Sequence, residues 1–136
     1  MANEKILIVE DETIIALDIK LILDELGYNV TAMIASGEDA IRKTEEILPD
    51  LVLMDINLKG RIDGLRAAEV IQNQFKIPVV YVTGYTDDKT LNILRQSKSA
   101  GFIPKPFNEI ELHSIIILAL QSRKLRLQYQ QSNKDK

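Results

Sequence analysis

The sequence has no cysteine, no tryptophan and only one histidine among its 136 residues. Without cysteine, a disulfide framework and a thiolate metal site are both excluded. The single histidine, His113, has no second histidine to bind a metal with, so we interpret it as structural. Aromatic residues make up only 5% of the chain, and the core must therefore be built from isoleucine, leucine, valine and alanine.

Excess positive charge and long apolar runs are also missing. The formal net charge is -3, so the basic surface typical of nucleic-acid binding is absent and direct nucleic-acid contact is not expected. No apolar run approaches the roughly 20 residues needed to span a bilayer. Residues 1–5 lead directly into a strand pattern, without the apolar region of a signal peptide. We therefore expect a cytoplasmic protein that does not insert into a membrane.

Short apolar runs alternate with longer helical patterns along the chain. Apolar runs of this length are typical of strands buried on both faces of a parallel sheet. The patterns predict strands at 6–9, 28–34, 51–54, 78–82 and 101–103, and helices at 13–26, 36–48, 64–75, 86–97 and from 108 onward. Five strands alternating with five helices predict an α/β, flavodoxin-like, doubly wound parallel sheet with strand order 2-1-3-4-5.

Helical spacing also predicts which side chains face the core. In the second helix these are Ala40, Ile41, Thr44 and Leu48, and in the last helix they are Ile110, Ile116 and Leu120 or their neighbours. The size suits one domain, which we place at residues 1–122. Residues 123–136 are rich in lysine, arginine and glutamine, and we interpret them as a helical or frayed C-terminal extension.

Polar side chains follow four of the predicted strands at the point where each strand ends. Glu10 and Asp11 follow the first strand, Asp55 ends the third, Thr83 ends the fourth and Lys105 follows the fifth. In a parallel sheet these positions share one edge, and ligands of open α/β sheets bind at that edge. Each residue alone has an ordinary structural role, but their common position predicts a site.

Three carboxylates close together repel one another by several kcal/mol per pair at an effective dielectric near ~20. Either one of them takes up a proton or a divalent cation neutralises them. Oxygen ligands without histidine or cysteine favour Mg²⁺. We therefore predict a Mg²⁺ site formed by Glu10, Asp11 and Asp55, with the backbone carbonyl of Asn57 as a further ligand.

A carboxylate can also act as a nucleophile and accept a phosphoryl group. Phosphoryl transfer needs alignment and stabilisation of charge on the equatorial oxygens. Mg²⁺, the Lys105 ammonium and the Thr83 hydroxyl would supply that stabilisation beside Asp55. These parts together make up a phosphoacceptor site.

The sequence resembles the receiver domains of response regulators from two-component systems, over roughly residues 4–122. The matching motifs are Ile6–Glu12, Leu51–Ile56, Asp63–Gly64, Val82–Gly84 and Lys105–Phe107. The resemblance implies that a sensor histidine kinase phosphorylates Asp55 in a Mg²⁺-dependent reaction. It implies a signalling switch and not an enzyme, since such domains catalyse only their own aspartate phosphorylation and dephosphorylation.

The resemblance also implies a route for the signal. Thr83 and Lys105 would contact the phosphoryl group, and Phe102 would act as the switch aromatic, where tyrosine is more frequent. The surface of the fourth helix, fifth strand and fifth helix would then change, and a homodimer through that surface is expected. The downstream protein target is not specified. The resemblance further implies a cis peptide bond between Lys105 and Pro106.

Two segments depart from the family pattern. Lys59-Gly60-Arg61 replaces a usual proline-containing turn, and Tyr85 occupies the position that tunes water access to the phosphoryl group.

Two other classes of function remain open. One is a docking module that is never phosphorylated; the other is an enzyme, either an FMN-binding protein or an aspartate-nucleophile phosphatase. The acids at 10–12 disfavour FMN phosphate, and Asn57 stands where the phosphatase needs a second aspartate.

Overall fold

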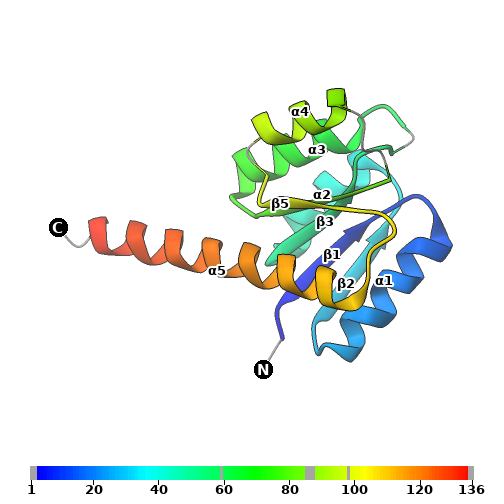
Figure 1. Ribbon diagram of the computed structural model, residues 1–136. Coiled ribbons are helices and arrows are strands. Elements are labelled where there is room, and N and C mark those ends of the chain that lie inside the picture. Colours follow the sequence, from blue (N-terminus) through cyan, green and yellow to red (C-terminus); the bar gives the residue numbers. More distant parts are fainter. Residues whose placement is uncertain (1–2, 59, 85–87, 98, 135–136) are drawn as a thin grey trace.

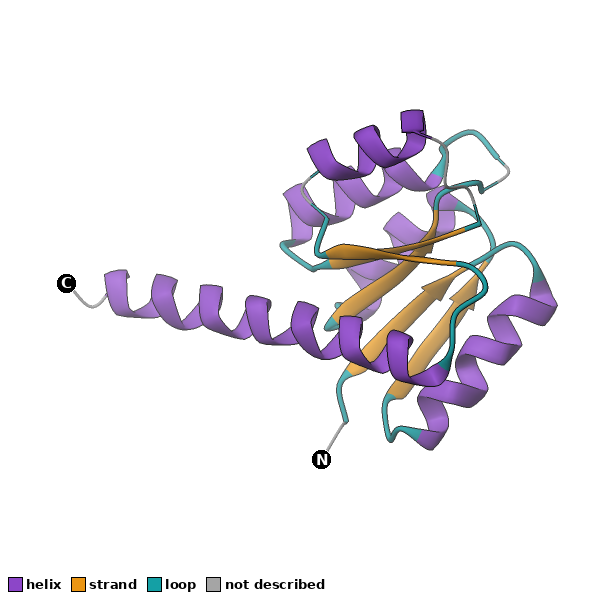
Figure 2. Cartoon of the chain, in the orientation of Figure 1, coloured by secondary structure: helices purple, strands orange, loops and turns teal. Residues whose placement is uncertain are grey.

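The computed structural model describes residues 3–58, 60–84, 88–97 and 99–134, and it shows one parallel sheet covered on both faces by helices (Figures 1 and 2). The strand order is β2-β1-β3-β4-β5, and every neighbouring pair is parallel, as predicted. The elements in chain order are β1 (Lys5–Val9), α1 (Thr13–Glu25), β2 (Asn29–Ile34), α2 (Gly37–Ile47), β3 (Leu51–Asp55), α3 (Gly64–Val70), the π-helix η1 (Ile71–Phe75), β4 (Val79–Thr83), α4 (Asp88–Gln96), β5 (Gly101–Pro104) and α5 (Glu109–Lys134).

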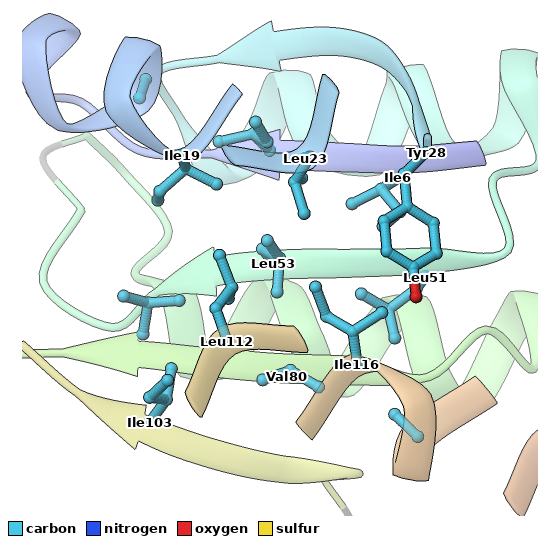
Figure 3. Packing of buried hydrophobic residues seen from close by; sticks show 14 residues of the cluster. Ile6, Ile19, Leu23, Tyr28, Leu51, Leu53, Val80, Ile103, Leu112 and Ile116 are labelled. Carbon is cyan, nitrogen blue, oxygen red and sulfur yellow. The ribbon is translucent and has the colours of Figure 1, made fainter. Parts of the chain in front are cut away.

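The sheet divides the core into two halves because successive side chains of a strand point to opposite faces. On one face, α1 and α5 pack against alternate residues of the central strands, and Figure 3 shows Ile19 and Leu23 of α1 meeting Leu112 and Ile116 of α5 over Leu53. On the other face, the buried side chains of α2, α3 and α4 cover the intervening residues. Both faces of β1, β3 and β4 are therefore buried, which explains their continuous apolar sequences.

Two of the predicted inward-facing residues are exposed, and the predictions for them were wrong. Leu48 is 59% exposed because it is the left-handed residue (φ 53°) that ends α2, where its N–H donates to the Thr44 carbonyl. Ile110 is 77% exposed, whereas Leu112 and Ile116 are fully buried. Two residues correspond to about 200° of rotation around a helix, so Ile110 lies on the side of α5 opposite to Leu112.

The last helix continues without a break past residue 122. It runs from Glu109 to Lys134, and its C-terminal half projects beyond the sheet (Figure 1). Asn108 caps its start, because the Asn108 side-chain oxygen accepts a hydrogen bond from the Glu111 N–H at 2.8 Å. None of the helices in the described ranges is long and apolar enough to cross a bilayer.

Candidate functional site

The ends of four adjacent strands bring the polar residues to one edge of the sheet. Asp55 is the last residue of β3 and Thr83 the last of β4, while Glu10 directly follows β1. These three are the buried acidic or hydroxyl side chains of that edge, each exposed by 5% or less. The strand order places β1, β3, β4 and β5 side by side, so the predicted convergence of these residues is what the fold produces.

Three carboxylates form a tight cluster at this edge. One oxygen of each of Glu10, Asp11 and Asp55 lies within 4.8 Å of the others. Glu10 and Asp55 are buried, and Asp11 is partly exposed. Asp11 is therefore the carboxylate of the cluster that is most accessible to solvent.

Lys105 balances part of this negative charge. Its Nζ lies 2.6 Å from Glu10 Oε1 and 3.7 Å from Asp55 Oδ2. The hydrogen-bonded partner of Lys105 is thus Glu10, and the contact with Asp55 is a longer ion pair. The peptide bond between Lys105 and Pro106 is cis, as predicted, and the Lys105 N–H donates to the Thr83 carbonyl at 2.7 Å.

Backbone amides contact the other carboxylate oxygens. The Asn57 N–H donates to Asp55 Oδ1 at 3.1 Å, and the Glu12 N–H donates to Glu10 Oε2 at 3.2 Å. The first of these bonds holds Asn57 next to Asp55. The role of the Asn57 carbonyl as a metal ligand remains a prediction.

Burial and mutual repulsion change the proton affinities within the site. Burial raises the pKa of Glu10 to about 7; the Lys105 hydrogen bond opposes this rise and the nearby Asp55 adds to it. For Lys105, burial alone would lower the pKa, but the hydrogen bond to Glu10 and the charge of Asp55 outweigh burial and raise it. Lys105 therefore stays charged, and Glu10 can exchange a proton near neutral pH.

The loop after β3 is fitted closely against Asp55. A Cβ atom added to Gly64 would lie 2.0 Å from the Asp55 carbonyl oxygen, so only glycine fits there. The Gly64 N–H donates to the Ile56 carbonyl at 3.1 Å, and Asp63 caps α3 by accepting from the Arg66 N–H. The sequence pattern Asp63–Gly64 is thus explained by a helix start that touches the backbone of the site.

Glu38 is a residue of this region that sequence reasoning missed. From the first turn of α2, its Oε1 accepts a hydrogen bond from the Ile62 N–H at 2.6 Å. This bond ties the loop after β3 to another helix. The only signal in the sequence is an acid in the first turn of a helix, and that position is ordinary for a glutamate.

Phe102 and Thr83 occupy neighbouring strands. Phe102 is partly buried in β5, pairs in register with Tyr81 of β4, and packs on the core half that contains α2, α3 and α4. The switching role of Phe102 is not tested by one conformation and stays a prediction. Lys59 and Tyr85, which depart from the family pattern, lie outside the described residues.

The donor set of the site fits Mg²⁺. The cluster offers carboxylate oxygens from Glu10, Asp11 and Asp55 and no nitrogen or sulfur ligand. Hard cations such as Mg²⁺ prefer oxygen ligands. Lys105 supplies one positive charge against three carboxylates, so an uncompensated negative charge remains to attract a cation. The acidic cluster is therefore compatible with magnesium binding.

Comparison with known proteins gives the family. Residues 6–117 match the model of the response regulator receiver domain. The transcriptional regulatory protein PdtaR of Mycobacterium tuberculosis is 32% identical over 116 residues, which cover 85% of this chain and 56% of PdtaR. The phyllosphere-induced regulator PhyR of Methylorubrum extorquens is 33% identical over 88% of this chain and 44% of PhyR. The chain thus spans about half the length of these curated relatives.

Solved structures show the same similarity. The signal receiver domain of a modulated diguanylate cyclase from Desulfovibrio desulfuricans G20 superposes with a TM-score of 0.86 at 31% identity, covering 91% of this chain and 98% of that one. The receiver domain of the sensor histidine kinase PA1611 from Pseudomonas aeruginosa PAO1 has a TM-score of 0.79 at 30% identity, with 88% and 99% covered. That structure holds a magnesium ion in its active site cleft.

The fold, the acidic edge and these matches agree. Members of this family are signalling switches that receive phosphoryl groups from histidine kinases. The chain belongs to the response regulator receiver domain family of two-component systems.

Proposed function

We propose that this chain is a phosphoacceptor switch in which Asp55 takes a phosphoryl group from a sensor histidine kinase in a Mg²⁺-dependent reaction. The observation that carries the proposal is the placement of Asp55. It is a buried carboxylate at a strand end, with oxygens of two further carboxylates within 4.8 Å and the Lys105 ammonium at 3.7 Å. An aspartate with only a structural role at a strand end requires neither the neighbouring carboxylates nor the nearby ammonium group.

The chemistry follows from these positions. An Asp55 oxygen attacks the phosphorus of the donor, a new O–P bond forms, and the P–N bond to the donor imidazole breaks with its electron pair returning to the ring. Magnesium held by Glu10, Asp11 and Asp55, with the Asn57 carbonyl as a further ligand, would neutralise charge on the transferred phosphoryl group. The chain catalyses only this transfer and the later hydrolysis of its own acyl phosphate.

Lys105 is already charged and close, but it bonds to Glu10. Because its Nζ is 2.6 Å from Glu10 and 3.7 Å from Asp55, a phosphoryl group on Asp55 offers it a new, more highly charged partner. We infer that Lys105 transfers its hydrogen bond from Glu10 to the phosphoryl oxygens. The Thr83 hydroxyl at the end of β4 would bind a second oxygen.

The conformational step follows from this change of partners. Movement of Thr83 toward the phosphoryl group would let Phe102 turn inward and reshape the surface of α4, β5 and α5. That surface would then bind a downstream target or a second copy of the chain. Phosphorylation shifts the population only as far as the phosphoryl group interacts differently with the two states. A cytoplasmic location fits a partner kinase whose donor histidine must reach this edge.

The test is the phosphoryl adduct itself. Incubation with acetyl phosphate and Mg²⁺ should give a phosphorylated species by intact-mass spectrometry, and EDTA or Asp55→Asn should abolish it. Asp50→Asn is the matched control, since Asp50 immediately precedes β3 at the opposite edge of the sheet, and it should keep the adduct.

Two results would contradict the proposal. An adduct that persists in Asp55→Asn would mean another acceptor. A folded wild-type chain that shows neither an adduct nor a Mg²⁺-dependent change would favour the docking module that is never phosphorylated.

A further inference from the structure

The start of α2 contacts the loop after β3 through the carboxylate of Glu38. Its Oε1 accepts a hydrogen bond from the Ile62 N–H at 2.6 Å, although the two residues are 24 positions apart in the chain. A Cβ atom added to Gly60 would lie 3.2 Å from Glu38 Oε2 and 3.3 Å from Glu38 Oε1. Both oxygens of one carboxylate therefore lie against the described part of this loop, residues 56–58 and 60–63.

The backbone of α2 also packs closely on the same part of the loop. A Cβ atom added to Gly37 would lie 2.7 Å from the Ile62 carbonyl oxygen and 3.2 Å from the Ala67 Cβ. The peptide groups of Ile62 thus meet two successive residues of α2, Gly37 at the carbonyl and Glu38 at the N–H. Displacement of the loop at this point requires the loss of a hydrogen bond and of a close backbone contact.

The neighbouring acid, Asp39, shows what an ordinary first-turn carboxylate does in this helix. Asp39 also lies in the first turn of α2, and its carboxylate pairs with Arg42 of the same helix. The favourable interaction of acids with the helix dipole applies to Asp39 and Glu38 alike. The hydrogen bond to a backbone amide of a distant loop distinguishes Glu38 from Asp39. Because its acceptor is ionised, this bond is roughly twice as strong as a neutral one.

The loop that Glu38 holds begins at the phosphoacceptor. At that end, the Asn57 N–H donates a hydrogen bond to Asp55 Oδ1 at 3.1 Å. Asn57 itself is exposed, and the next residue, Leu58, is buried. The segment that starts at Asn57 is therefore held by Asp55 and by the core at its beginning and by Glu38 at Ile62.

We propose that Glu38 is a positioning residue of the phosphoryl-transfer site, which fixes the loop after β3 and thereby sets the affinity of the site for Mg²⁺. The inference rests on the proposed function, in which the Asn57 carbonyl is a further ligand of the ion. The direction of that carbonyl depends on the backbone of the loop, and Mg²⁺ demands near-ideal octahedral geometry. Glu38 is not one of the three carboxylates of the acidic cluster, and it acts through the loop.

Calorimetric titration of the full chain with MgCl₂ tests the inference without any phosphoryl transfer. Glu38→Ala removes the acceptor of the Ile62 N–H and should raise the Mg²⁺ dissociation constant by roughly three- to tenfold. This is less than the roughly 10- to 100-fold typical of groups that bond directly to a metal ligand, because Glu38 acts at a distance. Glu38→Gln keeps a side-chain oxygen that can accept from the Ile62 N–H, so its dissociation constant should stay within about twofold of the wild-type value.

Asp39→Ala is the matched control, because it removes one negative charge from the same turn of α2 and leaves the Ile62 contact in place; it should also stay within about twofold of wild type. If Glu38→Gln binds Mg²⁺ as weakly as Glu38→Ala, the lost charge explains the effect and the inference is overturned. Equal affinities of the wild type and Glu38→Ala would overturn it too, and would leave the proposed function intact. A wild-type chain that binds no Mg²⁺ would refute the proposed function and this inference together.

Two further measurements separate positioning from a general loss of stability. With acetyl phosphate as donor, the half-saturating Mg²⁺ concentration for adduct formation should rise in Glu38→Ala, while the rate at saturating Mg²⁺ stays within about twofold of wild type. In EDTA, amide hydrogen exchange followed by NMR should be faster at the Ile62 N–H in Glu38→Ala and unchanged in Asp39→Ala. A lower saturating rate with an unchanged half-saturation, or an Ile62 amide as protected in Glu38→Ala as in the wild type, would overturn the inference.

Discussion

Replacing Gly64 with alanine tests how closely the loop after β3 is fitted to the site. The added Cβ would lie 2.0 Å from the Asp55 carbonyl oxygen and 2.9 Å from the Ile56 Cα. Both neighbours are backbone atoms of buried residues, so relief requires a shift of roughly 1 Å in β3 or in the start of α3. No flexible side chain can absorb the overlap.

The magnitude follows from two costs. Overpacking of a tightly packed interior costs about 1–3 kcal/mol. The shift also strains or breaks the hydrogen bond from the Gly64 N–H to the Ile56 carbonyl, which contributes about 0.5–1.5 kcal/mol. We expect Gly64→Ala to lower the free energy of unfolding by about 3 kcal/mol. Because the moving atoms belong to Asp55, we also expect slower formation of the phosphoryl adduct.

The assay is urea denaturation followed by circular dichroism, with EDTA present. Gly84→Ala is the matched control, because a Cβ at Gly84 would meet only the Lys105 Cδ at 4.0 Å, and its unfolding free energy should change by about 0.5 kcal/mol at most. The loss of backbone freedom in the unfolded chain is common to both variants, so their difference isolates the overlap. If Gly64→Ala is as stable as Gly84→Ala, the close approach at Asp55 is refuted.

Two further predictions concern the site and the core. Glu10 has a pKa of about 7 in the folded chain against 4.5 ordinarily, so between these pH values the folded state holds the extra proton. In EDTA the free energy of unfolding should therefore fall as pH rises from about 5 to 7, by at most ~1.4 kcal/mol per pH unit. The measurement is the urea midpoint as a function of pH for the wild type and for Glu10→Gln. Parallel pH dependences in the two proteins would contradict this expectation. In the core, Leu112→Ala should lower the free energy of unfolding by about 2–5 kcal/mol, because Leu112 is fully buried. Ile110→Ala should change the unfolding free energy by about 0.5 kcal/mol at most, because Ile110 is exposed. Similar losses in the two variants would mean that the face of α5 that packs on the sheet is wrongly assigned.

The parts of the fold that the sequence predicted are those governed by short-range pattern. Continuous apolar runs bounded by polar clusters identified β1, β3 and β4, since strands buried on both faces leave no room for polar residues. Ser36 and Asn108 were recognisable as helix starts because their side-chain oxygens accept backbone N–H groups three residues later. The convergence of Asp55 with Glu10 and Asp11 followed from the rule that parallel strands share one carboxyl edge.

Other features depend on contacts between segments far apart in the chain. Leu48 matched the apolar spacing of α2, yet a left-handed residue that ends a helix turns its side chain away from the helix face. The start of α5 offered both Ile110 and Leu112 as core residues, and only the position of α5 on the sheet decides between them. The 2.0 Å approach of Gly64 to Asp55 likewise exists only once β3 and α3 are placed together.

The sequence by itself determined the order of the elements, the edge at which the acids gather and the family to which the chain belongs. It did so because buried strands and helix starts are predicted from the sequence pattern within a few residues of each position. The tertiary structure decided that Lys105 bonds to Glu10 in preference to Asp55, and that burial raises the pKa of Glu10 to about 7. Distances between side chains from different strands and the extent of their burial arise only when the sheet is assembled, because each depends on the packing of residues nearly a hundred positions apart.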